Sequence, residues 1–572
     1  MKINWKKTTI MFILAASLVI PSATFQAAAD AKYTQASTPT KYQLTDSLQV
    51  EVKSILNEPT ANGTRLGAVV RLSNVGSRLV GVPEYEVRVK TDEGLEYIMR
   101  PSQANPRNIQ PRETIELSYM NTIDRYDEFS LSEISWLDVD EFVYPKQVNR
   151  VTSVPIADQE WKGDKADVTD LEHIKKWDES FTIPALSDAI AYTPVSLGEQ
   201  NSAEGLVTVV GIMATNVGTK KTALPDFRVN GKSDAKVFSG KRLEQESVLL
   251  GPGEKTYIHY ALPVKNKADL KSLLILTPET FVSEDKTVSS FLIGRLSIGL
   301  GGVASTQRFM NSLPSYTWNR PIQFDPLSDF VQSDVEVSLV DLRMSESTGG
   351  GFKAVVAKFK MLNKSGGPVQ VPHFDSLLTS SSGKKYAGIR QDTKVDTLIP
   401  NIGYVIYYSY IVPNSETGDG VAMEILDSSK VASFKFAVAA FKTKVVSDVG
   451  DSSLAFYPFD VKVNNWTIDS SYNSGKGSSY TYKLNIDLDV GMGDEAVVDQ
   501  SYSKLRFEAV DGSNRVMTSK LLTFTGDNKV VSGMQTLNFD LDRYESSVSL
   551  RMYEIMDTPF GEVRRLVQTW KR

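Results

Sequence analysis

The chain has 572 residues, of which 41% are hydrophobic and 23% are charged, and it contains no cysteine. These values are typical of a soluble protein with about four domains, and they exclude disulfides, thiol catalysis and cysteine-ligated metals. The formal net charge of −6 argues against nucleic acid or an anionic membrane surface as the principal partner.

The N-terminus has the pattern of a signal peptide in residues 1–29. Three lysines (Lys2, Lys6 and Lys7) precede an apolar run from Ile10 to Ile20, and small residues end the segment before Asp30. The run is shorter than the ~20 residues that a membrane span needs, so we expect cleavage and no membrane span afterwards. A retained anchor is the alternative. The mature chain would be secreted with a formal charge of −9, and it would begin with a flexible leader, residues 30–41.

One pattern occurs three times along the chain. It begins with Leu72-Ser-Asn74-Val-Gly76, and its asparagine returns at Asn216 and Asn363. A proline, an aromatic residue, a second proline and a tyrosine follow each asparagine at nearly constant spacing: Pro83, Tyr85, Pro111 and Tyr119; Pro225, Phe227, Pro252 and Tyr260; Pro372, Phe374, Pro400 and Tyr408. The asparagines are 142 and 147 residues apart, which is much longer than a solenoid repeat, so each copy is expected to be a domain.

Short segments of alternating apolar and polar residues, such as Leu48–Val52, run through each copy between turn signals such as Asp92-Glu-Gly94. A period of two favours antiparallel β-sandwiches over helical domains. The predicted order is β-sandwich 1 (42–150), a connector (151–190), β-sandwich 2 (191–300), a second connector (301–330), β-sandwich 3 (331–450) and β-sandwich 4 (451–572), a degenerate copy. The first connector holds a capping box, Thr169-Asp-Leu-Glu172, which predicts a short helix reaching Trp177.

These residues resemble the immunoglobulin-like repeat domains of secreted and surface-anchored Gram-positive bacterial proteins, most of them of unknown function. The resemblance rests on the Asn-x-Gly strand end, the Pro-x-aromatic pair, the Gly94-x-x-Tyr97 hairpin and the Pro252-Gly-Glu254 turn. It implies an all-β chain of about four tandem immunoglobulin-like β-sandwich domains after a signal peptide. Since the shared residues are turn and core residues, it brings no catalytic residues with it.

Residues suited to catalysis are scarce. The three histidines, His173, His259 and His373, fall in different predicted segments, which leaves little material for a histidine metal site or a Ser-His-Asp triad. The sequence contains no Gly-x-Ser-x-Gly, His-Glu-x-x-His or Walker-type motif. We therefore expect a protein that is not an enzyme and has no cofactor.

One candidate cation site lies in the fourth sandwich. Period two places three side chains on one face of each of two strands: Asn485, Asp487 and Asp489, and Asn538, Asp540 and Asp542. If the strands are neighbours, a hard cation such as calcium would relieve the repulsion between their carboxylates. The alternative is that these are solvated outer faces of strands that are not adjacent.

Four tyrosines cluster in the third copy: Tyr404, Tyr407, Tyr408 and Tyr410. They could form a stacking platform for a sugar, but packing in the core is the favoured interpretation.

Together these features indicate an exported, non-catalytic, multidomain binding or structural protein of the cell surface or wall. Its expected partner is a cell-wall polymer or another surface protein, and not nucleic acid. Two alternatives remain: a secreted polysaccharide-acting enzyme or its accessory subunit, and a structural subunit of a surface layer or spore coat.

Overall fold

The structure is a computed structural model that describes residues 40–571, apart from 141, 164–165, 204, 304, 329, 430–433, 447–454, 475–478, 494–495, 500–501 and 527–528. The predicted signal peptide therefore lies outside the described residues. The chain is nearly all β, with 60% strand and 3% helix, which confirms the all-β prediction. Among the described residues, no helix is both long enough and apolar enough to cross a bilayer.

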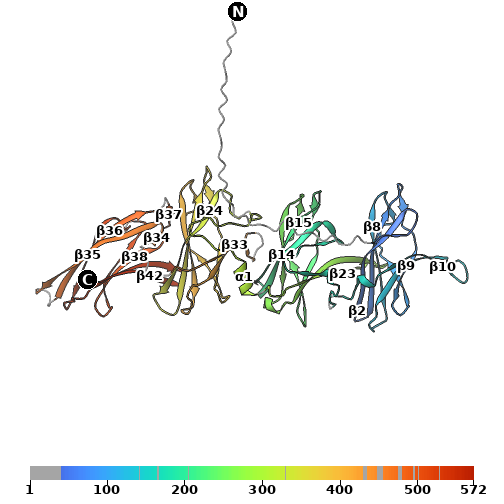
Figure 1. The fold of residues 1–572 in the computed structure, drawn as a ribbon, viewed down its shortest axis with the longest axis horizontal. Coiled ribbons are helices and arrows are strands. Elements are labelled where there is room, and N and C mark those ends of the chain that lie inside the picture. Colours follow the sequence, from blue (N-terminus) through green and yellow to red (C-terminus); the bar gives the residue numbers. More distant parts are fainter. Residues whose placement is uncertain are drawn as a thin grey trace, which may run out of the picture.

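The β structure forms an elongated rod (Figure 1). Four large clusters of buried hydrophobic side chains follow one another along it. We name the parts of the chain around these clusters unit 1 (42–161), unit 2 (171–299), unit 3 (335–443) and unit 4 (455–571). Between units 2 and 3 lies one short helix, α1 (Thr306–Ser312).

Unit 1 is a curled sheet in the order β1-β2-β3-β8-β6-β5-β9-β10, with β11 added to β2 and a small β4–β7 pair beside it. Because β6 pairs with both β8 and β5, the sheet passes from one layer to the other around a shared core. The elements are β1 (Tyr42–Gln43), β2 (Leu48–Thr60), β3 (Gly63–Asn74), β4 (Val80–Gly81), β5 (Glu86–Thr91), β6 (Glu96–Pro101), β7 (Asn108–Ile109), β8 (Thr114–Ile123), β9 (Leu131–Asp140), β10 (Gln147–Pro155), η1 (Ala157–Gln159) and β11 (Glu160–Trp161).

Unit 2 has two five-stranded sheets, ordered β12-β23-β22-β17-β18 and β13-β14-β15-β21-β19, with a small β16–β20 pair. The elements are η2 (Leu171–His173), β12 (Ile174–Lys176), β13 (Phe181–Ile183), β14 (Ser187–Ser202), β15 (Gly205–Asn216), β16 (Thr222–Ala223), β17 (Arg228–Lys232), β18 (Val237–Ser239), β19 (Lys241–Arg242), β20 (Leu249–Leu250), β21 (Lys255–Leu262), η3 (Lys267–Asp269), β22 (Ser272–Val282) and β23 (Val288–Gly299).

Units 3 and 4 share one sheet, ordered β29-β31-β25-β24-β42-β41-β38-β39, with β37 added to β31. Each unit also has a four-stranded sheet of its own, β28-β27-β32-β33 in unit 3 and β34-β35-β36-β40 in unit 4, and β26–β30 is a small pair in unit 3. The strands of unit 3 are β24 (Val335–Ser347), β25 (Lys353–Asn363), β26 (Val369–Gln370), β27 (Asp375–Thr379), β28 (Lys385–Ala387), β29 (Ile389–Arg390), β30 (Thr397–Leu398), β31 (Gly403–Val412), β32 (Val421–Asp427) and β33 (Phe436–Thr443). Those of unit 4 are β34 (Ala455–Phe456), β35 (Phe459–Asn473), β36 (Ser479–Met492), β37 (Ala496–Val498), β38 (Lys504–Val510), β39 (Val516–Thr523), β40 (Gly533–Leu541), β41 (Ser549–Thr558) and β42 (Gly561–Lys571).

The three asparagines of the sequence pattern make the same hydrogen bonds in units 1, 2 and 3. Asn216 is buried at the end of β15, where its Nδ2 donates to the carbonyls of Lys220 and Leu250, both at 2.8 Å. Its Oδ1 accepts from the backbone N–H of Gly218 at 2.9 Å. Asn74 and Asn363 hold the equivalent turns in the same way. Each amide thus satisfies buried backbone groups where a strand leaves the core.

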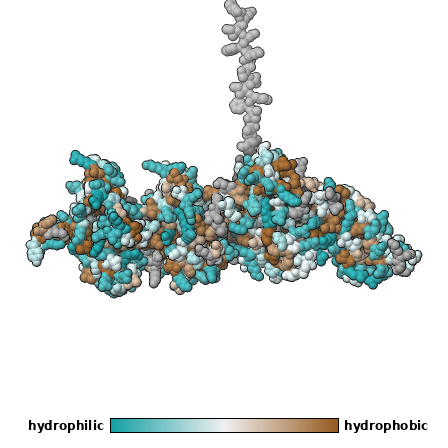
Figure 2. Space-filling model, turned by 180° about the vertical axis from the view of Figure 1, so that it is seen from behind, coloured by the Kyte–Doolittle hydropathy of each residue, from teal (hydrophilic) through white to brown (hydrophobic). Residues whose placement is uncertain are grey.

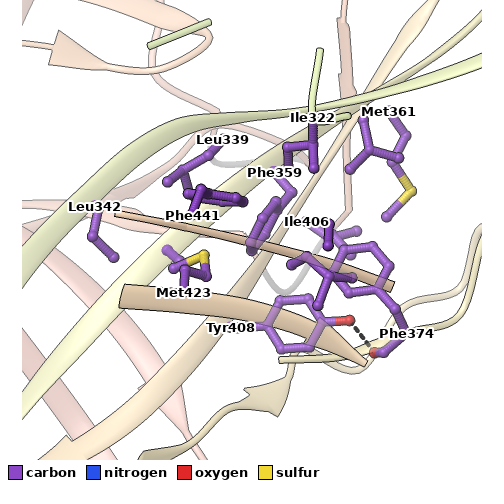
Figure 3. Packing of buried hydrophobic residues seen from close by; sticks show 14 of the residues in the cluster. Ile322, Leu339, Leu342, Phe359, Met361, Phe374, Ile406, Tyr408, Met423 and Phe441 are labelled. Atoms are coloured by element: carbon purple, nitrogen blue, oxygen red, sulfur yellow. Dashed lines mark hydrogen bonds between the residues drawn. The ribbon is translucent and has the colours of Figure 1, made fainter. Parts of the chain in front are cut away.

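The aromatic residues that recur in the sequence pattern pack in the cores of the units. Tyr260 donates its hydroxyl to the carbonyl of Phe227, and Tyr408 donates to that of Phe374, with both tyrosines buried. Figure 3 shows Tyr408 and Phe374 in the core of unit 3 beside Phe359 and Met423. A buried phenol needs such a partner, which explains why a tyrosine recurs opposite an aromatic residue.

The prediction of a helix after the capping box is wrong. A single 3₁₀ turn ends at His173, and its cap is Asp170, which accepts from the N–H of Glu172, rather than Thr169. The following residues form β12, which pairs in parallel with β23. Pairing with the edge of an existing sheet satisfies their backbone groups, whereas so short a helix would gain little from its few internal hydrogen bonds.

Replacement of Asn216 by alanine should destabilise unit 2 by about 2–4 kcal/mol, because two carbonyls and one N–H lose their partner in a buried site. Urea unfolding followed by hydrogen exchange in residues 205–223 would measure the change. The exposed Asn201 in β14 gives a matched control, since Asn201→Ala removes no described hydrogen bond. Equal stability of the two variants would contradict the assigned role.

Candidate functional site

The structure brings together the two strands that carry the predicted cation ligands, but not the ligands themselves. β36 and β40 are neighbours, yet their register places Asn485 opposite Thr536, and Asn538 opposite Lys483. Asn485 accepts from the hydroxyl of Thr536 at 2.9 Å, and Asp540 accepts from that of Thr481 at 2.6 Å. Asp487 lies opposite Met534, while Asp489 and Asp542 are exposed near the ends of their strands. Calcium binding at these strands stays a prediction.

Elsewhere the described residues contain no group of three or more histidine, aspartate or glutamate side chains placed to hold a metal ion. His173 pairs with Asp170, and His259 pairs with Glu244 at 2.6 Å on a different strand of the same unit. Two surface hollows measure about 180 and 80 Å³, the first lined in part by Tyr42 and Asp158. Both are smaller than the roughly 300–1,000 Å³ of a typical small-molecule site.

The tyrosines Tyr404, Tyr407, Tyr408 and Tyr410 are all buried, with at most 2% of each exposed. Packing is therefore their role, as the sequence favoured, and a sugar platform on β31 is excluded.

A tyrosine cluster that the sequence analysis did not single out lies at the far end of unit 4. It consists of Tyr472 on β35, Tyr480 on β36 and Tyr544 after β40, and we call it the tyrosine shelf. Neighbouring ring centroids are 5.2 and 5.5 Å apart, with interplanar angles of 56° and 55°. Tyr472 is 58% exposed and Tyr544 is 57% exposed. The shelf belongs to the hairpin at the left end of the rod in Figure 1.

The opposite end of the rod carries a second aromatic surface, on the hairpin formed by β9 and β10. Phe142 and Tyr144 at its tip are fully exposed, and Val143 and Val148 beside them are also exposed. Figure 2 shows this hairpin projecting from the left end of that view, with hydrophobic atoms on it. Fully exposed side chains contribute almost nothing to a folded core, so core packing does not explain these residues.

Between units 3 and 4 lies a cluster of buried charges. Glu554 on β41 contacts Lys358 of β25 at 2.6 Å and Arg565 of β42 at 2.8 Å, and all three are almost fully buried. Lys358 also lies 3.6 Å from Asp341, which pairs in turn with Arg343. The cluster joins strands of both units across the shared sheet, where β24 pairs with β42.

The charges of this cluster hold one another ionised. Burial alone would raise the pKa of Glu554, but the Lys358 ammonium and the Arg565 guanidinium overcome it and lower that pKa to about 2. Burial alone would lower the pKa of Lys358, and Glu554, Tyr502 and Asp341 raise it instead. Because the cluster joins side chains of both units, we assign it to the joint between them.

Units 1 and 2 are joined by an apolar contact with buried charges at its edge. Trp161 of unit 1 lies against Gly294, where a Cβ atom would come within 2.5 Å of the indole ring. Next to it, Arg295 donates to the Lys53 carbonyl at 2.9 Å and pairs with the buried Glu279 at 3.2 Å. Burial lowers the pKa of Arg295 to about 10.

The contact between units 2 and 3 differs from the other two. Gln200 exchanges two hydrogen bonds with the backbone of Lys435, and Tyr257 donates at 2.6 Å to Asp325 in the segment that precedes unit 3. The ring of His259 stacks on Phe436 at 3.9 Å. None of the buried hydrophobic clusters formed by the described residues contains side chains from both units.

No protein-family model and no curated protein matches the chain. Among solved structures, a DUF4785 family protein from Legionella pneumophila aligns at 8% identity and a TM-score of 0.16, over 68% of this chain and 92% of that one. Dimeric latent PorU from Porphyromonas gingivalis aligns at 10% identity and a TM-score of 0.13, over 68% of this chain and 35% of that one. The exo-chitosanase CsxA from Amycolatopsis orientalis aligns at 8% identity and a TM-score of 0.11, over 89% and 92%. At these TM-scores none of the likenesses carries an argument about function.

Removal of the central carboxylate should weaken the joint between units 3 and 4. Glu554→Gln removes the carboxylate that contacts both Lys358 and Arg565 in a buried site, so we expect a loss of about 3–5 kcal/mol in the stability of these units. Calorimetric unfolding of the mature chain would measure it. Lys504→Met is the matched control, because it breaks the exposed Lys504–Asp557 pair, for which about 0–1 kcal/mol is expected. Similar losses in the two variants would contradict the assignment.

A fall in pH should weaken the joint between units 3 and 4. The folded pKa of Glu554, about 2, lies below its unfolded value, so its contribution is present above pH ~4.5 and is lost as the pH falls toward 2. The stability difference between the wild type and Glu554→Gln should therefore shrink by about 3 kcal/mol between pH 5 and pH 2. Urea unfolding of both proteins across this range provides the measurement, and a difference that does not change with pH would refute the linkage.

Proposed function

We propose that the chain is an exported, non-catalytic binding protein of the bacterial cell surface or wall, built from four tandem immunoglobulin-like β-sandwiches. In this proposal the sandwiches form a rod that holds two aromatic binding surfaces apart. The observation that carries it is the position of those surfaces: the tyrosine shelf lies at one end of the rod, and the tip with Phe142 and Tyr144 lies at the other.

The turns and cores support the assignment of a repeated sandwich. The amide of Asn74, Asn216 or Asn363 ties the end of a strand to a small two-stranded pair in each of units 1 to 3. Unit 4 lacks this asparagine, and we treat it as a degenerate copy. Repetition gives a binding protein length and several contacts, which raise the effective concentration of each binding surface near a polymer.

The joints support a role in holding ends apart. Units 1 and 2 are fixed by buried apolar and charged side chains, and units 3 and 4 by a shared sheet. The proposed partner is a cell-wall polymer or another surface protein.

The proposal predicts that purified residues 30–572 sediment with isolated bacterial cell walls. Residues buried in the rod are unavailable to a polymer, so binding must come from exposed surfaces such as the two aromatic ends. The measurement is the fraction of protein in the pellet, with calcium and with a chelator. Loss of binding on chelation would give a role to Asp487, Asp489 and their neighbours.

Variants that lack the aromatic side chains of one end show which end binds. Phe142→Ala with Tyr144→Ala, and separately Tyr472→Ala with Tyr544→Ala, test each end in turn, and all four side chains are exposed enough for the fold to survive. A wild-type protein that remains in the supernatant at every calcium concentration would refute wall binding.

A further inference from the structure

We propose that the tyrosine shelf is a binding site for an uncharged glycan chain, with the exposed sides of Tyr472 and Tyr544 packing against its sugar rings. The inference rests on the proposed function and names the ligand class for one end of the rod.

The shelf lies near the turn of the β35–β36 hairpin, beyond the buried part of its inward face. Tyr472 lies opposite Tyr480, which lies opposite Leu541, so these side chains share one face. Further along β36 the same face carries Tyr482 and Leu484, which are buried in the core. The inward face of the hairpin therefore passes from buried side chains to the partly buried Tyr480 and the exposed Tyr472.

Core packing explains the shelf only in part. A cross-strand aromatic pair stabilises a hairpin, which accounts for Tyr472 facing Tyr480. It does not account for Tyr544, which comes from the loop after β40 and extends the row on the other side of Tyr480. No hydrogen bond from a described residue to the three phenol oxygens is found, so these hydroxyls remain able to bind a ligand.

The composition of the hairpin is that of a recognition loop. Of the fourteen residues from Asp469 to Tyr482, eleven are serine, tyrosine, glycine or asparagine. This is the residue set of antibody binding loops, in which tyrosine supplies rigid amphipathic contact area and the small polar residues supply adaptable hydrogen bonds. A strand that only had to pair would favour β-branched residues, which are nearly absent here.

The chemistry of the shelf matches a sugar chain. Sugars present apolar C–H faces that pack on aromatic rings and a rim of hydroxyls that bond to polar groups, and tyrosine offers both. Tyr480 contacts both other rings, at centroid distances of 5.2 and 5.5 Å, so it supports Tyr472 and Tyr544, whose exposed sides are available to a sugar. Beside Tyr544, Arg543 is accompanied by Asp542, so the shelf has no net positive charge to attract a phosphate-rich polymer.

The test is sedimentation of residues 30–572 with three uncharged insoluble glycans, cellulose, chitin and amylose granules, alongside whole cell walls. We expect binding to at least one glycan, and we expect Tyr472→Ala with Tyr544→Ala to weaken it by roughly tenfold through the loss of two ring contacts. Tyr472→Phe with Tyr544→Phe keeps the rings and should retain most of the binding. Tyr126→Ala is the matched control, because Tyr126 is 66% exposed in unit 1.

The outcomes separate the glycan site from wall binding. If the alanine variant binds glycan as well as the wild type does, or if the wild type binds whole walls but no glycan, the shelf proposal is overturned and wall binding stands. In the second case, loss of wall binding after protease treatment of the walls would identify a protein partner. A wild type that binds neither glycans nor walls would overturn both proposals.

Discussion

The buried contacts of the Glu554 carboxylate with Lys358 and Arg565 hold unit 3 against unit 4. Three charges with almost no exposure are stable only while all three remain together, because any one of them left alone in a buried site is costly. Since they come from both units 3 and 4, the units cannot separate without exposing or orphaning a charge. The shared sheet adds backbone hydrogen bonds across the same boundary. Units 3 and 4 therefore act as one body.

The other two joints differ in how much buried contact holds their units together. The contact of Trp161 with Gly294 and the buried Arg295–Glu279 pair fix units 1 and 2 in the same manner. Between units 2 and 3 the contacts are mainly polar, and such contacts lose less when water replaces them. Of the three joints, the one between units 2 and 3 therefore has the least buried apolar and charged contact to hold it.

The sequence predicts the local features of this chain well, because they depend on residues close together along it. Alternation with period two places Leu484 in the core and Asn485 outside it, and the structure agrees. The asparagine pattern marks turns whose hydrogen bonds recur three times. Features that depend on register or on distant strands could not be predicted. The alternation predicted that the trios beginning at Asn485 and Asn538 share one face if their strands are neighbours, and the register of β36 and β40 confirms this, but it separates the two trios along the strands, and no local signal encodes that offset.

The same limit explains why the tyrosine shelf was not found from the sequence. Tyr480 and Tyr482 both fit the alternation of an inward face, but Tyr482 is buried, whereas Tyr480 is only partly buried against the core. How far such a tyrosine is covered depends on residues from distant parts of the chain, such as Tyr544. One local signal was available: the run of serine, glycine and asparagine around Tyr472 is too polar and too small to fill a core. The exposure of Tyr472 and Tyr544, at 58% and 57%, is the physical reason for proposing that these two residues take part in recognition.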